Sequence, residues 1–347
     1  MTGALQKKFD WKILLPIVIP VLIGIGLIIF DWARVREILQ QADWQVIPAA
    51  LLFVLGSNSL LSISYVSLAR IIGIRMDGYQ MGIIYFATNA MNRLVRSGGV
   101  AGFMTRYFMM KPSGVGLNDV LNSSFIHFLL SSLIMHVMVL PVVIVLLVTH
   151  PIPIGLFLFL VIFACLAVFT AFLIGSIIFS DPLRRRVARG GIWLGKKIIR
   201  RDFTGQIESF LSQANGATHS LKENQKDFSL VILMLVAEWL ANVFVLFFCL
   251  RSFGTPLSFS GTAAIYSLAT IASVISAIPG GIGIQEGVIT SLAVVLGTSF
   301  EQAVLGALLF RVLQTFLPYL GSLVFYPRLL RKVNAAEVKP TDAGIDL

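Results

Sequence analysis

The sequence predicts an all-α polytopic membrane protein, built as an inverted-topology repeat in which each half holds three spans and one glycine-centred re-entrant hairpin. Of the 347 residues, 57% are hydrophobic and 13% are charged, and the mean hydropathy is +0.88. This composition places most of the chain in a lipid bilayer and excludes an ordinary soluble domain. The net charge of +10 indicates basic cytoplasmic loops, and we expect no nucleic-acid partner.

The repeat is visible in the spacing of matching residues in the two halves. The matching positions of the first half are Gly73, Tyr85, the pair Gly98-Gly99 and Asp119. Those of the second half are Gly254, Tyr266, the pair Gly280-Gly281 and Glu301. In both halves the first two positions are 12 residues apart, and the carboxylate follows the glycine pair by 20 residues. A doubled, glycine-interrupted apolar segment is the sequence feature that best indicates a transporter site.

Six apolar segments are long enough to span a bilayer, because a crossing helix needs about 20 residues. They cover residues 12–30, 46–70, 119–148, 154–179, 228–250 and 301–326. The first lacks a small-residue cleavage site, so we expect a retained span rather than a signal peptide. Segments 79–112 and 260–298 are broken by their glycine pairs. Each of their arms is short for a full crossing, which predicts either a re-entrant hairpin or two short spans.

The charges predict the orientation. The loop 181–227 carries ten lysine and arginine residues, so we expect this loop, the N-terminus and the tail 336–347 in the cytoplasm, beneath a bacterial-type inner membrane. The two hairpins then enter from opposite faces, and the chain divides into repeats 1–150 and 151–335. Apolar residues at helical spacing within the basic loop indicate either an interfacial helix on anionic lipid or a helix packed under the bundle.

The second half contains a recognisable motif, Pro279-Gly-Gly-Ile-Gly-Ile-Gln-Glu286-Gly, followed by Arg311 and Pro318 in the next span. It resembles the flippase-like integral membrane family that includes the transmembrane domain of lysylphosphatidylglycerol synthases. The resemblance implies a lipid translocator. The first half departs from the family pattern, because Gly102-Phe-Met-Thr-Arg106 has Phe103 where many relatives carry a glutamate. Arg106 therefore lacks its usual near partner.

Charged groups inside spans indicate where function lies, because each costs about 2.5–3.5 kcal/mol on insertion scales. Glu286 and Arg311 are equally far from the turn near residues 297–300. We therefore expect them to form an ion pair about 15 Å deep, near the bilayer centre. The pair is either a headgroup or proton site or a pin between helices. The same comparison of distances from a turn, applied to the first half, places Arg106 at the same depth as His127. His127 is either a site residue or a hydrogen-bonded packing residue.

Polar residues also gather at the first glycine pair. Asn89, Asn92, Arg93 and Arg96 precede Gly98 and Gly99, and a re-entrant hairpin would bring them to a polar cavity. Glycine N–H groups and guanidinium groups there would bind phosphate. The alternative is that the arginines lie on a surface turn. Glu238, one turn before Asn242, has either a packing or a transport role.

These features lead to one favoured function and two alternatives. We expect the translocation of a polar, anionic or phosphate-bearing lipid headgroup through a cavity between the two hairpins. The candidate substrate-binding residues are Glu286, Arg311, Gly280, Gly281, Gly98, Gly99, Arg106, Arg96, Asn92 and His127. The alternatives are a secondary transporter of a small soluble solute, and an intramembrane lipid-modifying enzyme or the membrane part of an aminoacyl-phospholipid system. We expect no enzyme activity, cofactor or metal, and a homo-oligomer is left open.

Overall fold

The computed structural model describes residues 32–94, 100–149, 154–194, 204–276, 278 and 281–337, and all regular structure in these ranges is helical. Five helical stretches are long and apolar enough to span a membrane. They are Trp44–Ile71, Leu117–Val148, Phe157–Phe179, Gln225–Arg251 and Phe300–Pro327. They coincide with five of the six predicted spans. The sixth, residues 12–30, lies outside the described residues.

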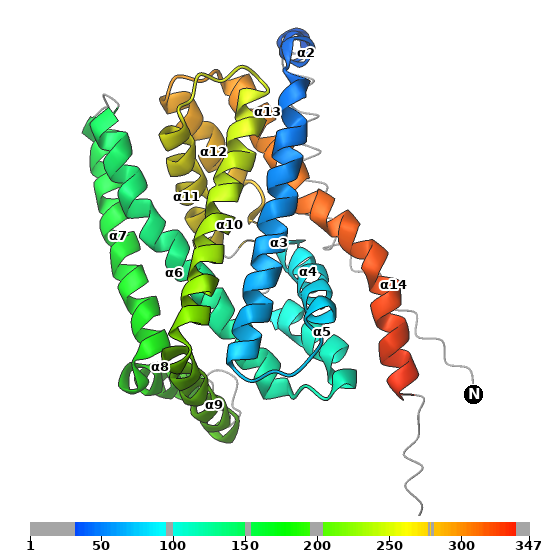
Figure 1. Ribbon diagram of the computed structural model, residues 1–347. Coiled ribbons are helices and arrows are strands. Elements are labelled where there is room, and N and C mark those ends of the chain that lie inside the picture. Colours follow the sequence, from blue (N-terminus) through cyan, green and yellow to red (C-terminus); the bar gives the residue numbers. More distant parts are fainter. Residues whose placement is uncertain are drawn as a thin grey trace, which may run out of the picture.

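The long helices form the body of the bundle (Figure 1). They are α3 (Ile47–Ile71), α6 (Leu117–Thr149), α7 (Ile154–Phe179) and α10 (Gln225–Arg251), together with the last span, which α13 (Phe300–Arg311) and α14 (Leu317–Glu337) form between them. α3 and α10 pack against each other along the centre, and α6 packs on α7. α7 lies at the edge of the bundle in Figure 1, and many of its large apolar side chains, such as Phe169 and Phe172, are exposed. Apolar outer faces of this kind contact lipid rather than water.

Two pairs of shorter helices occupy the two segments that were predicted to fold back at their glycine pairs. The first pair is α4 (Gly78–Leu94) and α5 (Val100–Met110), and the second is α11 (Phe259–Ile275) and α12 (Ile284–Val295). Helices of 17 residues are about 26 Å long, less than the roughly 30 Å hydrocarbon core. The partners in each pair pack against each other. In Figure 1 the first pair lies in the lower half of the bundle and the second in the upper half.

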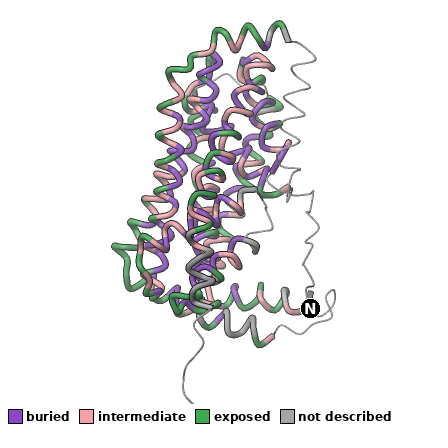
Figure 2. The backbone as a smooth tube through the Cα atoms, turned by 90° about the vertical axis from the view of Figure 1, so that its right-hand side faces the viewer, coloured by how far each residue is buried: buried purple, intermediate pink, exposed green. Residues whose placement is uncertain are grey.

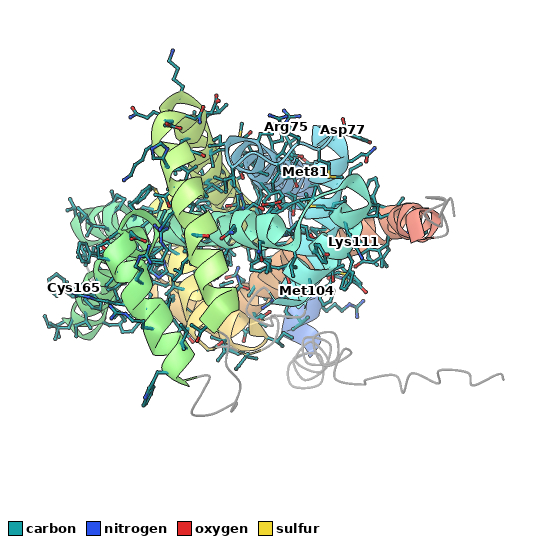
Figure 3. The ribbon with its side chains drawn as sticks, turned by 90° about the horizontal axis from the view of Figure 1, so that it is seen from below. Arg75, Asp77, Met81, Met104, Lys111 and Cys165 are labelled. Carbon is teal, nitrogen blue, oxygen red and sulfur yellow. The ribbon has the colours of Figure 1, made fainter. Side chains whose placement is uncertain are left out.

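Three smaller helices lie at the ends of the bundle. α2 (Trp32–Gln41) is at the upper end, while α8 (Asp181–Leu194) and α9 (Thr204–Glu223) extend across the lower end (Figures 1 and 3). The α9 residues Leu211, Ala214 and Leu221 are all buried. Of the two interpretations of the basic loop, packing under the bundle is therefore correct for α9.

Close contact between helices depends on small residues. Gly306 of α13 faces Leu250 of α10 so closely that a Cβ there would lie 2.6 Å from a Leu250 methyl carbon and 3.1 Å from its Cα. Small residues allow the backbones of membrane helices to approach in this way. Figure 2 shows that buried residues follow the inward faces of the helices through the bundle, with exposed residues on the outside.

The last span is irregular at its middle. Between α13 and α14, residues Val312–Phe316 form a π-helical segment, η6, directly after Arg311. Leu313, Gln314 and Thr315 in this segment are buried. Such π-helical insertions within α-helices are frequent at functional sites.

Candidate functional site

A cavity of about 370 Å³ lies within the bundle. Its walls come from α3, α4, α5, α6, α10 and α11. The polar and aromatic side chains that line it include Tyr85, Asn89, Asn92, Arg106, Ser124, His127, Glu238, Trp239, Tyr266 and Thr270. This volume lies within the usual range for small-ligand sites, about 300–1,000 Å³.

Arg106 is the buried cation on the wall of this cavity. Its side chain is 1% exposed, and its guanidinium stacks on two tyrosine rings, with Cζ 4.7 Å from the centroid of Tyr65 and 4.3 Å from that of Tyr85. Nε donates to Thr88 Oγ1 at 3.2 Å and Nη1 donates to Ser124 Oγ at 2.6 Å. Cation–π contacts of this kind stabilise a desolvated arginine.

All of these partners are neutral. Within the described part of the chain, no carboxylate forms an ion pair with Arg106. The position where relatives carry a glutamate is held by Phe103, whose ring centroid lies 5.8 Å from Arg106 Cζ. Arg106 is therefore held in place by hydroxyl groups and aromatic rings, and its positive charge is not neutralised by these contacts.

His127 lies in the same cluster, as the predicted common depth required. Its Nε2 is 2.9 Å from Ser64 Oγ, and its Nδ1 is 3.1 Å from Tyr85 Oη. Both ring nitrogens are thus engaged, which fits the hydrogen-bonded packing interpretation. Because Tyr85 stacks under Arg106, His127 positions the tyrosine that supports the guanidinium.

Asn92 joins the first helix pair at the cavity wall. Its Oδ1 accepts a hydrogen bond from Gly102 N at 2.8 Å, and its amide occupies the space that a Cβ on Gly102 would need. Asn89 and Asn92 therefore line a cavity, as predicted. The predicted residues Arg96, Gly98, Gly99 and Gly280 lie outside the described residues, and so does the side chain of Arg93.

Glu286 and Arg311 form the predicted ion pair. Arg311 Nε donates to Glu286 Oε1, and the two side chains are 4% and 8% exposed, respectively. Arg311 Nη2 also donates to Gly281 O at 3.3 Å, and Glu286 Oε2 accepts from Gly283 N at 2.9 Å. The two charges thus hold the turn between α11 and α12, where Gly281 and Gly283 have φ values of 61° and 79°.

The placement of this pair differs from the expected cavity between the two hairpins. Glu286, Arg311 and Gly281 are not among the described residues that line the cavity. No lining residue comes from α12. The reason is that the two charged side chains bond to each other and to backbone groups of the turn. Gly281 N donates to Ile278 O at 2.8 Å, so this glycine N–H is engaged within the turn rather than offered to a ligand.

A chain of polar side chains connects the cavity to the last span. Glu238, on the cavity wall, accepts from Asn242 Nδ2 at 2.6 Å. Asn242 Oδ1 accepts in turn from Gln314 Nε2 in the π-helical segment. Gln314 is three residues beyond Arg311. The cavity is therefore linked by hydrogen bonds through α10 to the π-helical segment that directly follows Arg311.

Sequence reasoning missed several residues of this site. Tyr65, Thr88 and Ser124, which hold Arg106, were not identified, and Tyr85 was used only to align the repeat. One signal was available on α6, where Ser124 and His127 are followed by Ser131 and lie on one helical face. Polar residues at such spacing in an apolar span indicate a buried polar cluster.

Comparison with known proteins gives a consistent result. Residues 14–321 match the family model of the lysylphosphatidylglycerol synthase TM region. Similar proteins include the phosphatidylglycerol lysyltransferases of Staphylococcus aureus strains COL, MSSA476 and MRSA252, each 34% identical over 92 residues. This stretch covers 26% of the present chain and 11% of the length of each relative.

Proposed function

The chain belongs to the family of the lysylphosphatidylglycerol synthase transmembrane region, and on this premise we propose that it is a flippase-like protein that moves a phosphate-bearing lipid headgroup between leaflets. It is an integral membrane protein with a membrane role in lipid modification or translocation. The observation that carries the proposal is the buried Arg106 on the cavity wall, held by neutral partners. A phosphate would supply the missing negative charge.

The residues around Arg106 and the Glu286–Arg311 pair have different roles in this proposal. Arg106 contacts the headgroup phosphate, and Asn92 and His127 position the walls around it. The Glu286–Arg311 pair braces the glycine turn of the second helix pair, because its hydrogen bonds end on that turn. Rigid support of this kind keeps a binding site in its productive geometry.

The rim of the cavity favours a lipid over a soluble solute. Phe128 and Val274 line the cavity and are 42% and 43% exposed. Apolar, exposed side chains at the rim suit acyl chains that remain in the bilayer while the headgroup enters. A carrier for a soluble solute would instead enclose its substrate on all sides.

A second candidate function is supported by Glu238. This carboxylate lines the same cavity from α10, next to Trp239. A carboxylate and an indole ring suit a cationic group. The headgroup would then carry both a phosphate and an ammonium, as in the aminoacylated phospholipid implied by the name of the staphylococcal relatives, and the chain would be the membrane part of an aminoacyl-phospholipid system.

We propose that the fold is an inverted repeat, with halves 1–150 and 151–335 and a tail 336–347. In this assignment α3, α4, α5 and α6 correspond to α10, α11, α12 and α13 with α14. A two-fold relation requires reciprocal contacts between the halves. Three observations support it: α3 packs on α10, α6 packs on α11, and α14 packs on α4. The opposite ends occupied by the two short pairs (Figure 1) also support hairpins that enter from opposite faces.

We also propose that the lower end in Figure 1 is cytoplasmic, in a bacterial-type inner membrane. The arginines of α8 lie at this end, and so do the loops that carry Arg75 and Lys111 (Figure 3). Short cytoplasmic loops are enriched in lysine and arginine. This orientation leaves Arg251 at the outer end of α10.

The test is a transport assay in liposomes. Purified protein should speed the exchange of a fluorescent phosphatidylglycerol between leaflets, without ATP, as measured by dithionite quenching. Arg106→Gln should slow exchange about 10- to 100-fold, since a hydrogen bond to a charged group contributes about 1.5–3 kcal/mol. Arg251→Gln, at an exposed arginine, is the matched control and should exchange at the rate of the unmodified chain.

Comparison of lipids separates the two candidates. Faster exchange of an aminoacylated lipid than of phosphatidylglycerol, lost in Glu238→Gln, would favour the zwitterionic headgroup. If a folded sample exchanges no anionic, zwitterionic or isoprenoid lipid, the lipid function is rejected in favour of a soluble solute.

A further inference from the structure

A second pocket lies apart from the cavity, where α6, α7, α8 and α9 meet at the lower end of the bundle in Figure 1. Its volume is about 230 Å³, and its walls are almost entirely apolar, with Leu129, Ile177 and Leu211 among them. A space below the usual range of small-ligand sites holds part of a ligand rather than a whole one. An apolar space of this size suits a stretch of one acyl chain.

One charged side chain lines this pocket. Arg184 of α8 is 8% exposed. Its Nη1 donates to Ile178 O at 3.1 Å and to Thr218 Oγ1 at 3.0 Å. Its Nε is buried and has no hydrogen-bond partner within the described residues. A buried donor without an acceptor costs about 1–3 kcal/mol, so this N–H group requires an acceptor that the described residues do not provide.

The neighbouring carboxylate does not accept from Arg184: one of its oxygens pairs with Arg185, and its Oδ1 is buried without a hydrogen-bond partner within the described residues. Asp181 Oδ2 accepts from Arg185 Nε at 2.8 Å, and this pair is largely exposed. Burial lowers the pKa of Arg184, and the charge of Asp181 only partly opposes this effect. An arginine remains protonated even so. Arg184 is thus a buried cation at the wall of an apolar pocket, and its Nε–H has no acceptor within the described residues.

The surface around the pocket is basic. Arg185, Arg186 and Arg189 on the same helix are exposed. Each basic residue near a membrane surface contributes about 1 kcal/mol of attraction to anionic lipid. A free phosphate ion would satisfy the donor but leave the apolar walls empty. A neutral lipid would fill the walls without a charge-assisted hydrogen bond.

We propose that this pocket binds one acyl chain of an anionic phospholipid, whose headgroup oxygen accepts a hydrogen bond from Arg184 Nε. The bound lipid ties α8 and α9 to the ends of α6 and α7. It is a resident lipid rather than the transported one, because the lining residues of this pocket and of the transport cavity are different. The inference therefore stands independently of the proposed function.

The test uses the full chain in nanodiscs of phosphatidylcholine alone or mixed with phosphatidylglycerol. Native mass spectrometry counts the phosphatidylglycerol that stays bound, and thermal unfolding gives the stabilisation. Arg184→Gln should lower phosphatidylglycerol retention about tenfold and remove its stabilising effect. Arg185→Gln removes the same charge from the adjacent exposed position and should retain lipid like the unmodified chain. Inorganic phosphate in detergent should give no stabilisation.

A second variant keeps the test decisive if Arg184→Gln does not fold. Ala188→Leu fills the pocket from α8 and leaves Arg184 intact, and it should also lose the retained lipid. Retention in Arg184→Gln equal to that in Arg185→Gln would overturn the headgroup contact. Retention in Ala188→Leu would overturn the acyl-chain site, and so would stabilisation by inorganic phosphate that matches the effect of the lipid.

Discussion

Removing either member of the buried Glu286–Arg311 pair should destabilise the protein strongly. With side chains 4% and 8% exposed, a single Arg311→Met substitution leaves a carboxylate inside the bundle whose remaining hydrogen bond within the described residues comes from Gly283 N. Breaking a buried pair costs about 3–5 kcal/mol. Glu286→Gln should be similarly damaging, because it leaves the Arg311 charge opposite a neutral amide.

The double variant Glu286→Gln with Arg311→Met should recover much of this loss. The glutamine amide oxygen still accepts from Gly283 N, and each donor lost with Arg311, such as the one to Gly281 O, costs about 1 kcal/mol for one hydrogen bond. The expected coupling energy between the two substitutions is therefore at least about 2 kcal/mol. Arg251→Met, at an exposed arginine, is the control and should leave stability within about 0.5 kcal/mol.

Unfolding can be followed through the two cysteines. Cys249 is buried and Cys165 is exposed, so a Cys165→Ser background gives a thiol that reacts when the bundle opens. Denaturant titration of that reaction gives the free energy of unfolding. Strict additivity of the two single substitutions would refute the assignment of a coupled pair. A folded double variant without lipid exchange would instead contradict a role for the pair in stability alone.

Two further predictions concern topology and packing. In the Cys165→Ser background, Ser113→Cys should be labelled by an impermeant thiol reagent from the cytoplasm and Pro256→Cys from outside; labelling of both from one side would end the inverted-repeat proposal. Ser113 and Pro256 are both exposed, so a thiol at either position is accessible to the reagent. Gly306→Ala should cost about 1–3 kcal/mol through overpacking against Leu250. Gly175→Ala, in open space on α7, should be neutral or stabilising, and equal unfolding free energies for the two variants would contradict the contact.

The amino-acid sequence by itself determined the elements that depend on local composition. Apolar segments of about 20 residues predict spans without knowledge of their neighbours, and five of the six were confirmed within the described residues. The interruption at Gly281 and the pairing of Glu286 with Arg311 also followed from spacing, since antiparallel helices joined by a short turn set equal depth. Lateral packing partners do not follow from such periodicity.

The tertiary structure alone decided which polar groups share a cavity. Arg106 is held by Tyr65, Thr88 and Ser124, which come from three different helices, so no interval in the sequence predicts the cluster. The same holds for Arg184, whose partner Thr218 lies on the next helix. Glu286 and Arg311 were expected at the cavity, yet the structure turns both to the glycine turn, where backbone groups satisfy them. Burial and hydrogen-bond completion depend on helix rotation about the long axis, and the packing of the whole bundle sets that rotation.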